Sequence, residues 1–223
     1  MNWVEKSITE SKKLRTHYRM KNIDIYIKDM LPEHINPDRV FKFISKRVPA
    51  HLMSRVDIIY VGQFDIFKEK ETNAVYDDGA IYLTNEQDNE DDMIDDIIHE
   101  IAHSVEEKYF DFIYGDQTLK KEFLGKRQRL YSILSVNEYK PYNKVKNTYL
   151  YDQQIDMYFY KEVGYDRMWY LINGLFLSPY AATSLREYFA VGFEQYYLKD
   201  RSQIKKECPF LYNKLAEIEF PEG

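Results

Sequence analysis

The sequence predicts an α+β fold, in which a small twisted N-terminal sheet with a backing helix precedes a mostly helical C-terminal half. Two observations predict it. Alternation of apolar and polar residues, which is typical of strands, occurs in the first 84 residues. From about residue 105 onward the chain is rich in aromatic residues, and its pattern is helical. Strands followed by a run of helices are what an α+β architecture predicts.

Four segments of the N-terminal half carry the predicted sheet and its helix. Each has the period of its element, and the hairpin has an Asp-Gly turn between two apolar runs. The segments are strands over residues 22–30 and 55–64, a helix that Pro37 opens and that covers 38–48, and a hairpin over 74–84 that turns at Asp78 and Gly79.

An acidic run at residues 85–96 marks the start of the next helix. Acidic side chains in the first turn complement the positive end of the helix dipole, and Asp88 or Asn89 is the expected cap. The helices expected after it lie near residues 117–135, 150–176, 184–199 and 208–218, with breaks at 137–143 and 177–184.

Length and composition indicate one domain over residues 1–223, with subdomains over about 1–108 and 109–223. A core of this size needs no disulfide, and Cys208 is the single cysteine. The net charge of −6 argues against a nucleic-acid partner. Composition gives no indication of an oligomeric state.

The N-terminal 20 residues interleave charges with apolar residues. This pattern is neither a signal peptide nor a membrane span, so we expect no membrane partner. The expected location is the cytoplasm, or outside the cell if a leader has already been removed.

The motif His-Glu-Ile-Ala-His at residues 99–103 predicts a zinc site. His99 and His103 are one helical turn apart, so both imidazoles can approach one Zn²⁺ per chain. Glu100 is rotated away from the ligand line, near enough to take a proton from a zinc-bound water. The alternative is a metal-free helical interaction protein, in which the histidines flank a buried face of isoleucines without function.

A catalytic zinc usually has a third protein ligand and an open position for water. Glu187, near the start of a predicted helix, is one candidate. Ser184 and Glu187 also have the spacing of a capping box, so Glu187 could serve only its own helix. Residue spacing leaves this choice open, and it leaves three other acids as competitors: Asp152, Asp156 and Glu194.

The two stretches "HEIAH" and "YAATSLREYFAVGF" together resemble the anthrax lethal factor-like family of zinc metallopeptidases, which is related to the proline-proline endopeptidases. The resemblance implies a zincin-like fold of gluzincin type, with an active-site cleft between the subdomains. It implies that Glu187 is the third zinc ligand. It also implies that Tyr180, seven residues earlier, stabilises the oxyanion of the tetrahedral intermediate.

In that family the edge strand before the active-site helix binds substrate as an added strand. The resemblance therefore implies that residues 79–84 bind a polypeptide substrate, through Gly79, Ala80, Ile81 and Tyr82. The chain departs from the family in the long gap between His103 and Glu187, which an inserted helical segment within 115–165 would explain. Proline specificity is therefore not carried over.

The resulting hypothesis is a zinc-dependent endopeptidase that hydrolyses peptide bonds with a metal-activated water. His99, His103 and Glu187 would hold the metal, and Glu100 and Tyr180 would be catalytic. The alternative within metal chemistry is a catalytically inactive zinc-binding protein that holds a peptide or protein partner in a peptidase-like cleft.

Overall fold

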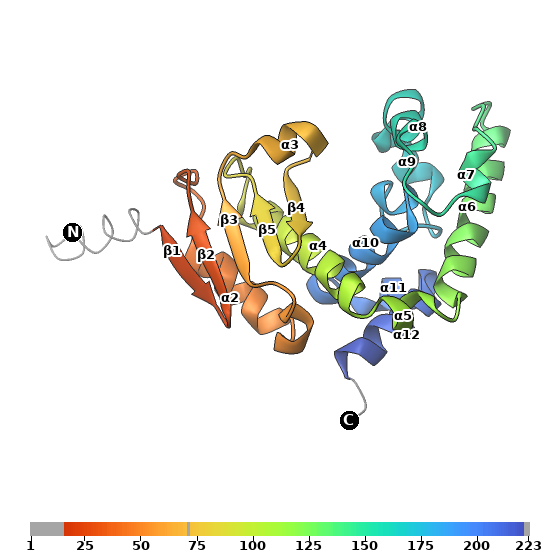
Figure 1. Cartoon of the computed structure of the whole chain (residues 1–223). Helices are drawn as coiled ribbons and strands as arrows, with labels where there is room; N and C mark the ends of the chain where they lie inside the picture. Colours follow the sequence, from red (N-terminus) through yellow and green to blue (C-terminus); the bar gives the residue numbers. More distant parts are fainter. Residues whose placement is uncertain (1–15, 71, 221–223) are drawn as a thin grey trace, which may run out of the picture. The chain divides into compact units, whose positions relative to one another are not determined.

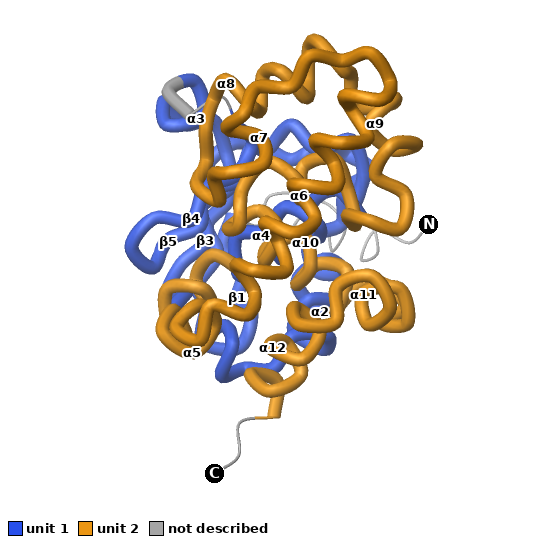
Figure 2. The backbone as a smooth tube through the Cα atoms, turned by 90° about the vertical axis from the view of Figure 1, so that its right-hand side faces the viewer, with its two compact units in different colours: residues 1–101 blue, residues 102–223 orange. Residues whose placement is uncertain are grey.

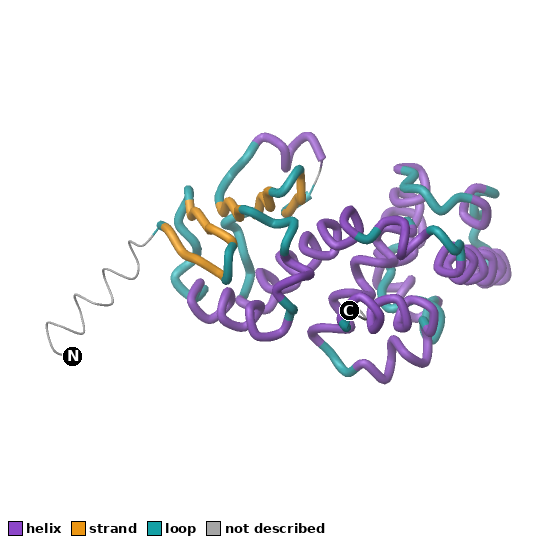
Figure 3. Tube along the Cα trace, turned by 60° about the horizontal axis from the view of Figure 1, so that its bottom comes forward, coloured by secondary structure: helices purple, strands orange, loops and turns teal. Residues whose placement is uncertain are grey.

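The strands lie in the first part of the chain, where the helices α2 (Pro37–Arg47) and α3 (Asp65–Lys70) come between them, and the part that follows is mostly helical. The computed structural model describes residues 16–70 and 72–220, and its strands all precede residue 84 (Figure 1). Figure 3 shows the same division, with strands gathered in one part of the molecule and helices making up the rest. The predicted α+β fold, a small sheet followed by a mostly helical half, is confirmed.

The chain divides into two compact units, residues 1–101 and 102–223 (Figure 2). The boundary falls inside the long helix α4 (Glu90–Lys108).

The first unit contains a mixed five-stranded sheet. Its outer pairs β1–β2 and β4–β5 are antiparallel hairpins, and its central pairs β2–β3 and β3–β5 are parallel. In spatial order the strands are β1 (His17–Met20), β2 (Ile23–Ile27), β3 (Ile58–Val61), β5 (Ala80–Leu83) and β4 (Ala74–Asp77).

One face of the sheet is buried. Ile25, Ile59 and Ile81 lie opposite one another in register across the three central strands, and none of them is exposed. Further buried side chains of this unit come from the apolar stripe of helix α2 (Pro37–Arg47) and from that of the first half of α4. The opposite face carries a row of stacked tyrosines from the same strands: Tyr26, Tyr60 and Tyr82.

The predicted hairpin over 74–84 is confirmed. Asp78 and Gly79 both have positive φ, 41° and 85°, as the central residues of a type I′ turn require. Strand β1 was not predicted, although its buried Tyr18 and Met20 alternate with the exposed His17 and Arg19. A tight turn at Lys21, with φ of 54°, joins β1 to β2. Two further short elements, η1 (Ala50–Met53) and α3 (Asp65–Lys70), were also not predicted.

The prediction that residues 79–84 form an edge strand is wrong. Strand β5 is paired on both sides, with β3 and with β4, and the edge is β4. The backbone groups of Ala80, Ile81 and Tyr82 are therefore engaged within the sheet, and Gly79 lies in the turn. An added strand at this side of the sheet could pair only with β4.

The second unit is helical. Three predicted helices, over 117–135, 184–199 and 208–218, are confirmed within two residues at each end. The helix predicted over 150–176 is wrong as one element. Gly164 has a φ of 82° and interrupts it. The elements are α5 (Phe110–Tyr114), α6 (Thr118–Val136), α7 (Lys144–Asn147), α8 (Gln153–Met157), the π-helix η2 (Tyr158–Val163), α9 (Tyr165–Leu171), η3 (Tyr180–Ala182), α10 (Leu185–Leu198), α11 (Arg201–Glu207) and α12 (Pro209–Glu219).

The core of this unit contains a buried cation. Arg127 of α6 is 0 % exposed. Its Nε donates to the carbonyl of Val145, and its Nη1 donates to the carbonyls of Ala182 and Thr183. Burial lowers the pKa of Arg127 to about 10, although the negative charge of Asp152 acts to raise it. The guanidinium thus joins α6 to the segment that precedes α10.

Within residues 16–70 and 72–220, no helix combines the length and the apolar character needed to cross a membrane. The predictions made for the first 20 residues concern mainly residues 1–15, which lie outside the described residues. Cys208 is fully buried between α11 and α12, and burial raises the pKa of its thiol to about 11.

Candidate metal centre

Helix α4 positions the two histidines. Asn89 is its cap, since the side-chain oxygen accepts a hydrogen bond of 3.0 Å from the backbone N–H of Asp92. Further along, Ile98 and Ile101 are completely buried and anchor one face of the helix. His99 and His103 follow one another by a single turn, so they share the adjacent, half-buried face.

Helix α10 positions the third candidate ligand. Its cap is Ser184, whose side-chain oxygen accepts a hydrogen bond of 3.2 Å from the backbone N–H of Glu187. This is the half of a capping box that the spacing predicts. The carboxylate of Glu187 has a further neighbour, because its Oε2 lies 3.8 Å from Nε2 of His103.

Three side chains come together: each of His99, His103 and Glu187 has a potential ligand atom that lies within 4.8 Å of those of the other two. In the part of the chain that the structure describes, this is the one group of histidine, cysteine or acidic residues with such spacing. The side chains of His103 and Glu187 are only 12 % and 14 % exposed. The structure therefore contains a half-buried His-His-Glu group that is compatible with a metal ion.

The donor set fits a metal of the zinc type. Two imidazole nitrogens and one carboxylate oxygen are the ligands found in His₂Glu catalytic zinc sites, which keep the fourth position open. Ligands bound tetrahedrally at about 2.1 Å lie roughly 3.4 Å apart. The 3.8 Å between His103 and Glu187 closes to that value with a small side-chain adjustment.

A second carboxylate, Glu106, lies behind His103. Its Oε2 is 3.2 Å from Nδ1 of His103 and accepts a hydrogen bond of 2.9 Å from Nε of Arg186. Its Oε1 accepts a hydrogen bond of 2.7 Å from the hydroxyl of Tyr114. Burial raises the pKa of Glu106, but the hydrogen bonds and the charge of Arg186 outweigh burial and leave this pKa below its ordinary value.

Glu100, the predicted general base, is held by the edge of the sheet. It is 7 % exposed, and its Oε2 accepts a hydrogen bond of 2.6 Å from the backbone N–H of Tyr76 in β4. One carboxylate oxygen is thereby fixed in position.

Tyr180, the predicted oxyanion donor, begins the turn η3 seven residues before Glu187. Its backbone carbonyl accepts hydrogen bonds from the backbone N–H and the hydroxyl of Thr183, at 2.9 and 2.8 Å. The side chain is 39 % exposed. The structure thus fixes the backbone of Tyr180, and the residue is partly exposed to solvent.

Two of the three competing acids have structural roles elsewhere. Asp152 caps α8 by accepting hydrogen bonds from the backbone N–H groups of Gln154 and Ile155. Asp156 accepts hydrogen bonds from the hydroxyls of Tyr151 and Tyr165. Neither they nor Glu194 belong to the His-His-Glu group, which singles out Glu187.

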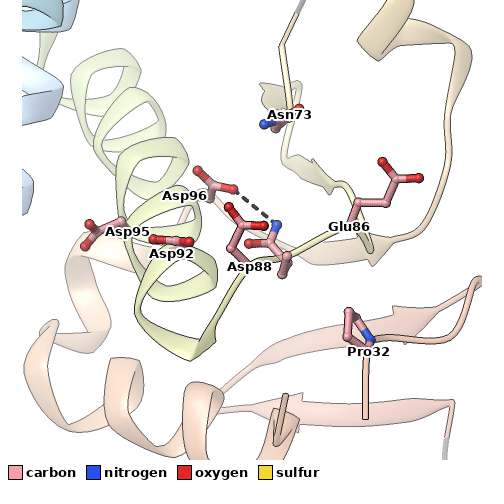
Figure 4. Close-up of a pocket in the computed structure, with 8 residues that line it drawn as sticks. Pro32, Asn73, Glu86, Asp88, Asp92, Asp95 and Asp96 are labelled. Carbon is pink, nitrogen blue, oxygen red and sulfur yellow. Dashed lines mark hydrogen bonds between the residues drawn. The ribbon is translucent and has the colours of Figure 1, made fainter. Parts of the chain in front are cut away.

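An acidic pocket of about 690 Å³ lies in the first unit at the start of α4. Figure 4 shows the carboxylates of Asp92, Asp95 and Asp96 along the first turns of the helix, with Asp96 accepting a hydrogen bond of 3.2 Å from the Gln87 amide (Figure 4). Of these carboxylates, Asp92 lies in the first turn, where the helix dipole stabilises a negative charge. These carboxylates do not form a group with metal-ligand spacing.

Three side chains and one backbone group of the centre were not predicted: Glu106, Arg186, Tyr114 and the N–H of Tyr76. A signal existed for Glu106, which follows His103 by three residues and so lies on the same side of the helix. Acidic residues at that spacing are also common on solvated helix faces. The spacing alone therefore does not distinguish a carboxylate that contacts His103 from one that is merely solvated.

Comparison with known proteins gives no match. No protein-family model, no curated protein and no solved structure matches this chain. The case for its function therefore depends on its own residues and their geometry.

Proposed function

We propose that the protein is a zinc-dependent endopeptidase. The observation that carries the proposal is the His-His-Glu group of His99, His103 and Glu187, with Glu100 directly after the first histidine on the same helix. Three candidate ligands and a candidate base in this sequence pattern are typical of a metallopeptidase, and this supports the proposal.

The remaining residues have defined roles in this proposal. When bound, zinc would lower the pKa of a coordinated water to about 7. Glu100, fixed by the Tyr76 N–H, would act as the general base toward the attacking water and as the proton donor to the leaving amine. Tyr180 donates a hydrogen bond to the oxygen on which negative charge develops.

The edge strand β4 supports a polypeptide substrate. Asp77 pairs with Ala80 across the turn and directs its backbone groups toward β5, so Tyr76 directs its own toward the open edge. A polypeptide that lay alongside this edge would pass Tyr76 and, with it, the carboxylate of Glu100.

The test combines metal content with cleavage. Purified, untagged protein is expected to contain about one zinc per chain and to cleave members of a diverse peptide library, with cleavage lost after chelation and restored by zinc. Metal without chelator-sensitive cleavage would instead favour the inactive zinc-binding protein. Protein with no zinc, and with no thermal shift when zinc is added, would contradict both.

Glu187→Ala should weaken zinc binding by more than about 100-fold, since loss of even an outer-shell partner costs 10–100-fold. A competition titration against a chromogenic chelator measures this affinity. The matched control is Glu194→Ala, two turns further along α10 and outside the group. Equal affinities for the two variants would remove Glu187 from the ligand set.

Tyr180→Phe should lower kcat by about 100-fold, the effect of losing one oxyanion donor, with unchanged zinc content. Steady-state cleavage of the best library peptide measures it. The control is Tyr170→Phe, a phenol that is 84 % exposed on α9. A kcat of Tyr180→Phe equal to that of the control would assign the phenol no catalytic role.

A further inference from the structure

Glu106 is an unusual carboxylate. It is 3 % exposed and lies one turn beyond His103 on α4. Three groups surround it within hydrogen-bond distance: the imidazole of His103 at 3.2 Å, the guanidinium of Arg186 at 2.9 Å and the phenol of Tyr114 at 2.7 Å. A buried charge is costly unless it is paired and hydrogen-bonded, and Glu106 is both.

This arrangement selects one tautomer of His103. Its Nδ1 lies 3.2 Å from the Glu106 carboxylate, which only accepts, and 3.5 Å from Nη2 of Arg186, which only donates. The carboxylate is closer and negatively charged, and Arg186 already donates to it through Nε. Nδ1 is therefore the protonated nitrogen, and the lone pair of Nε2 is directed toward the side on which Glu187 lies.

Arg186 extends the same arrangement to the second ligand. It directly precedes Glu187 in the first turn of α10, so the ion pair between Arg186 and Glu106 joins the two helices next to both ligands. Tyr114 occupies the other oxygen of Glu106 and so prevents the carboxylate from rotating away from His103.

We infer that Glu106 is a positioning residue of the metal centre: it holds His103 as the Nδ1–H tautomer, and Arg186 and Tyr114 hold Glu106 in place for that purpose. The inference rests on the metal site of the proposed function and does not depend on peptidase activity. Outer-shell carboxylates of this kind orient a metal-bound imidazole and increase its basicity.

The first test is metal affinity. Glu106→Ala should lower the affinity for zinc by about 10- to 100-fold, and Glu106→Gln, which keeps an acceptor without the charge, by a smaller factor. Competition titration with a chromogenic chelator measures both. Glu107→Gln, the exposed neighbour on the same helix, is the matched control and should bind zinc like the wild type.

Folding is controlled separately. Circular dichroism and thermal unfolding of the metal-free variants identify those that keep the native structure. If Glu106→Ala does not fold, Arg186→Gln still decides the matter, because the Arg186 side chain is 64 % exposed and its replacement keeps the Glu106 carboxylate but removes the ion pair that positions it. Arg186→Gln should weaken zinc binding by several-fold, and an unchanged affinity in the folded variants overturns the inference.

The second test reads the tautomer directly. In zinc-loaded protein labelled with ¹⁵N-histidine, His103 should show a proton on Nδ1 and metal on Nε2, and this signature should weaken or split in Glu106→Ala. If the metal were bound to Nδ1 of His103 in the wild type, the inference would be overturned and the proposed function would not. A wild type that binds no zinc would overturn the proposed function and the inference together.

Discussion

Replacing Glu100 with Gln is expected to reduce peptide hydrolysis by about 10³-fold while about one zinc per chain remains bound, since a positioned general base typically contributes 10²–10⁴-fold. Gln has the shape of Glu, and its side-chain oxygen can still accept the N–H of Tyr76. It cannot take a proton from water. The measurements are kcat/KM for a library-derived peptide and zinc content by elemental analysis.

Glu107→Gln is the control for this experiment, because it makes the same chemical change at an exposed position of the same helix. It should hydrolyse peptide at the wild-type rate. A Glu100→Gln protein as active as Glu107→Gln would contradict the mechanism, even if zinc were present at full occupancy.

Arg127→Met should destabilise the protein by about 3 kcal/mol. The guanidinium is the donor to three buried or half-buried carbonyls, of Val145, Ala182 and Thr183, and each acceptor left without a donor costs roughly 1–3 kcal/mol. Removal of the buried charge itself offsets part of this cost. In a chain of this length the melting temperature should fall by roughly 6–12 °C.

Thermal unfolding of the zinc-free protein measures this effect without the contribution of metal binding. Arg129→Met is the matched control, since Arg129 is exposed on the same helix and its replacement should change stability by less than about 0.5 kcal/mol. If Arg127→Met unfolded at the control's temperature, the three carbonyls would not depend on the guanidinium.

The fold class could be predicted from the sequence because the period of strands occurs only in the first 84 residues, whereas the chain from about residue 105 onward has the helical period. Local features with their own residue chemistry were predicted well: Asp78 and Gly79 formed the expected turn, and Asn89 the expected cap. The break in the predicted helix over 150–176, which depends on the backbone conformation of one residue, was not predicted. Gly164 interrupts an apolar pattern that continues on both sides of it.

The order of strands in the sheet could not be read from the chain. In the hairpin, β5 is the strand nearer to α4 in sequence, yet β4 takes the edge. Which strand of a hairpin pairs with β3 depends on burial of both faces of the sheet, a tertiary property. Val75 is buried although it lies on the edge strand β4. An apolar residue in the sequence therefore does not tell which of β4 and β5 is the edge strand.

The two histidine ligands of the candidate site could be predicted because one helix supplies both of them. His99 and His103 are related by helical geometry alone. Glu187 required a resemblance, because no local rule relates residues on two helices that are far apart in the chain. Glu106 shares a helix with the histidines, but its role depends on Arg186 and Tyr114, which come from elsewhere.

The hydrogen bond between Tyr76 and Glu100 has a consequence for self-association. Exposed edge strands invite pairing with strands of other molecules and so promote aggregation. On β4 the outward N–H of Tyr76 is taken by Glu100, and the carbonyl of Ala74 accepts from the hydroxyl of Thr72. Two backbone groups of a four-residue strand are thus already satisfied within the chain, which makes this edge a poor template for intermolecular sheet formation.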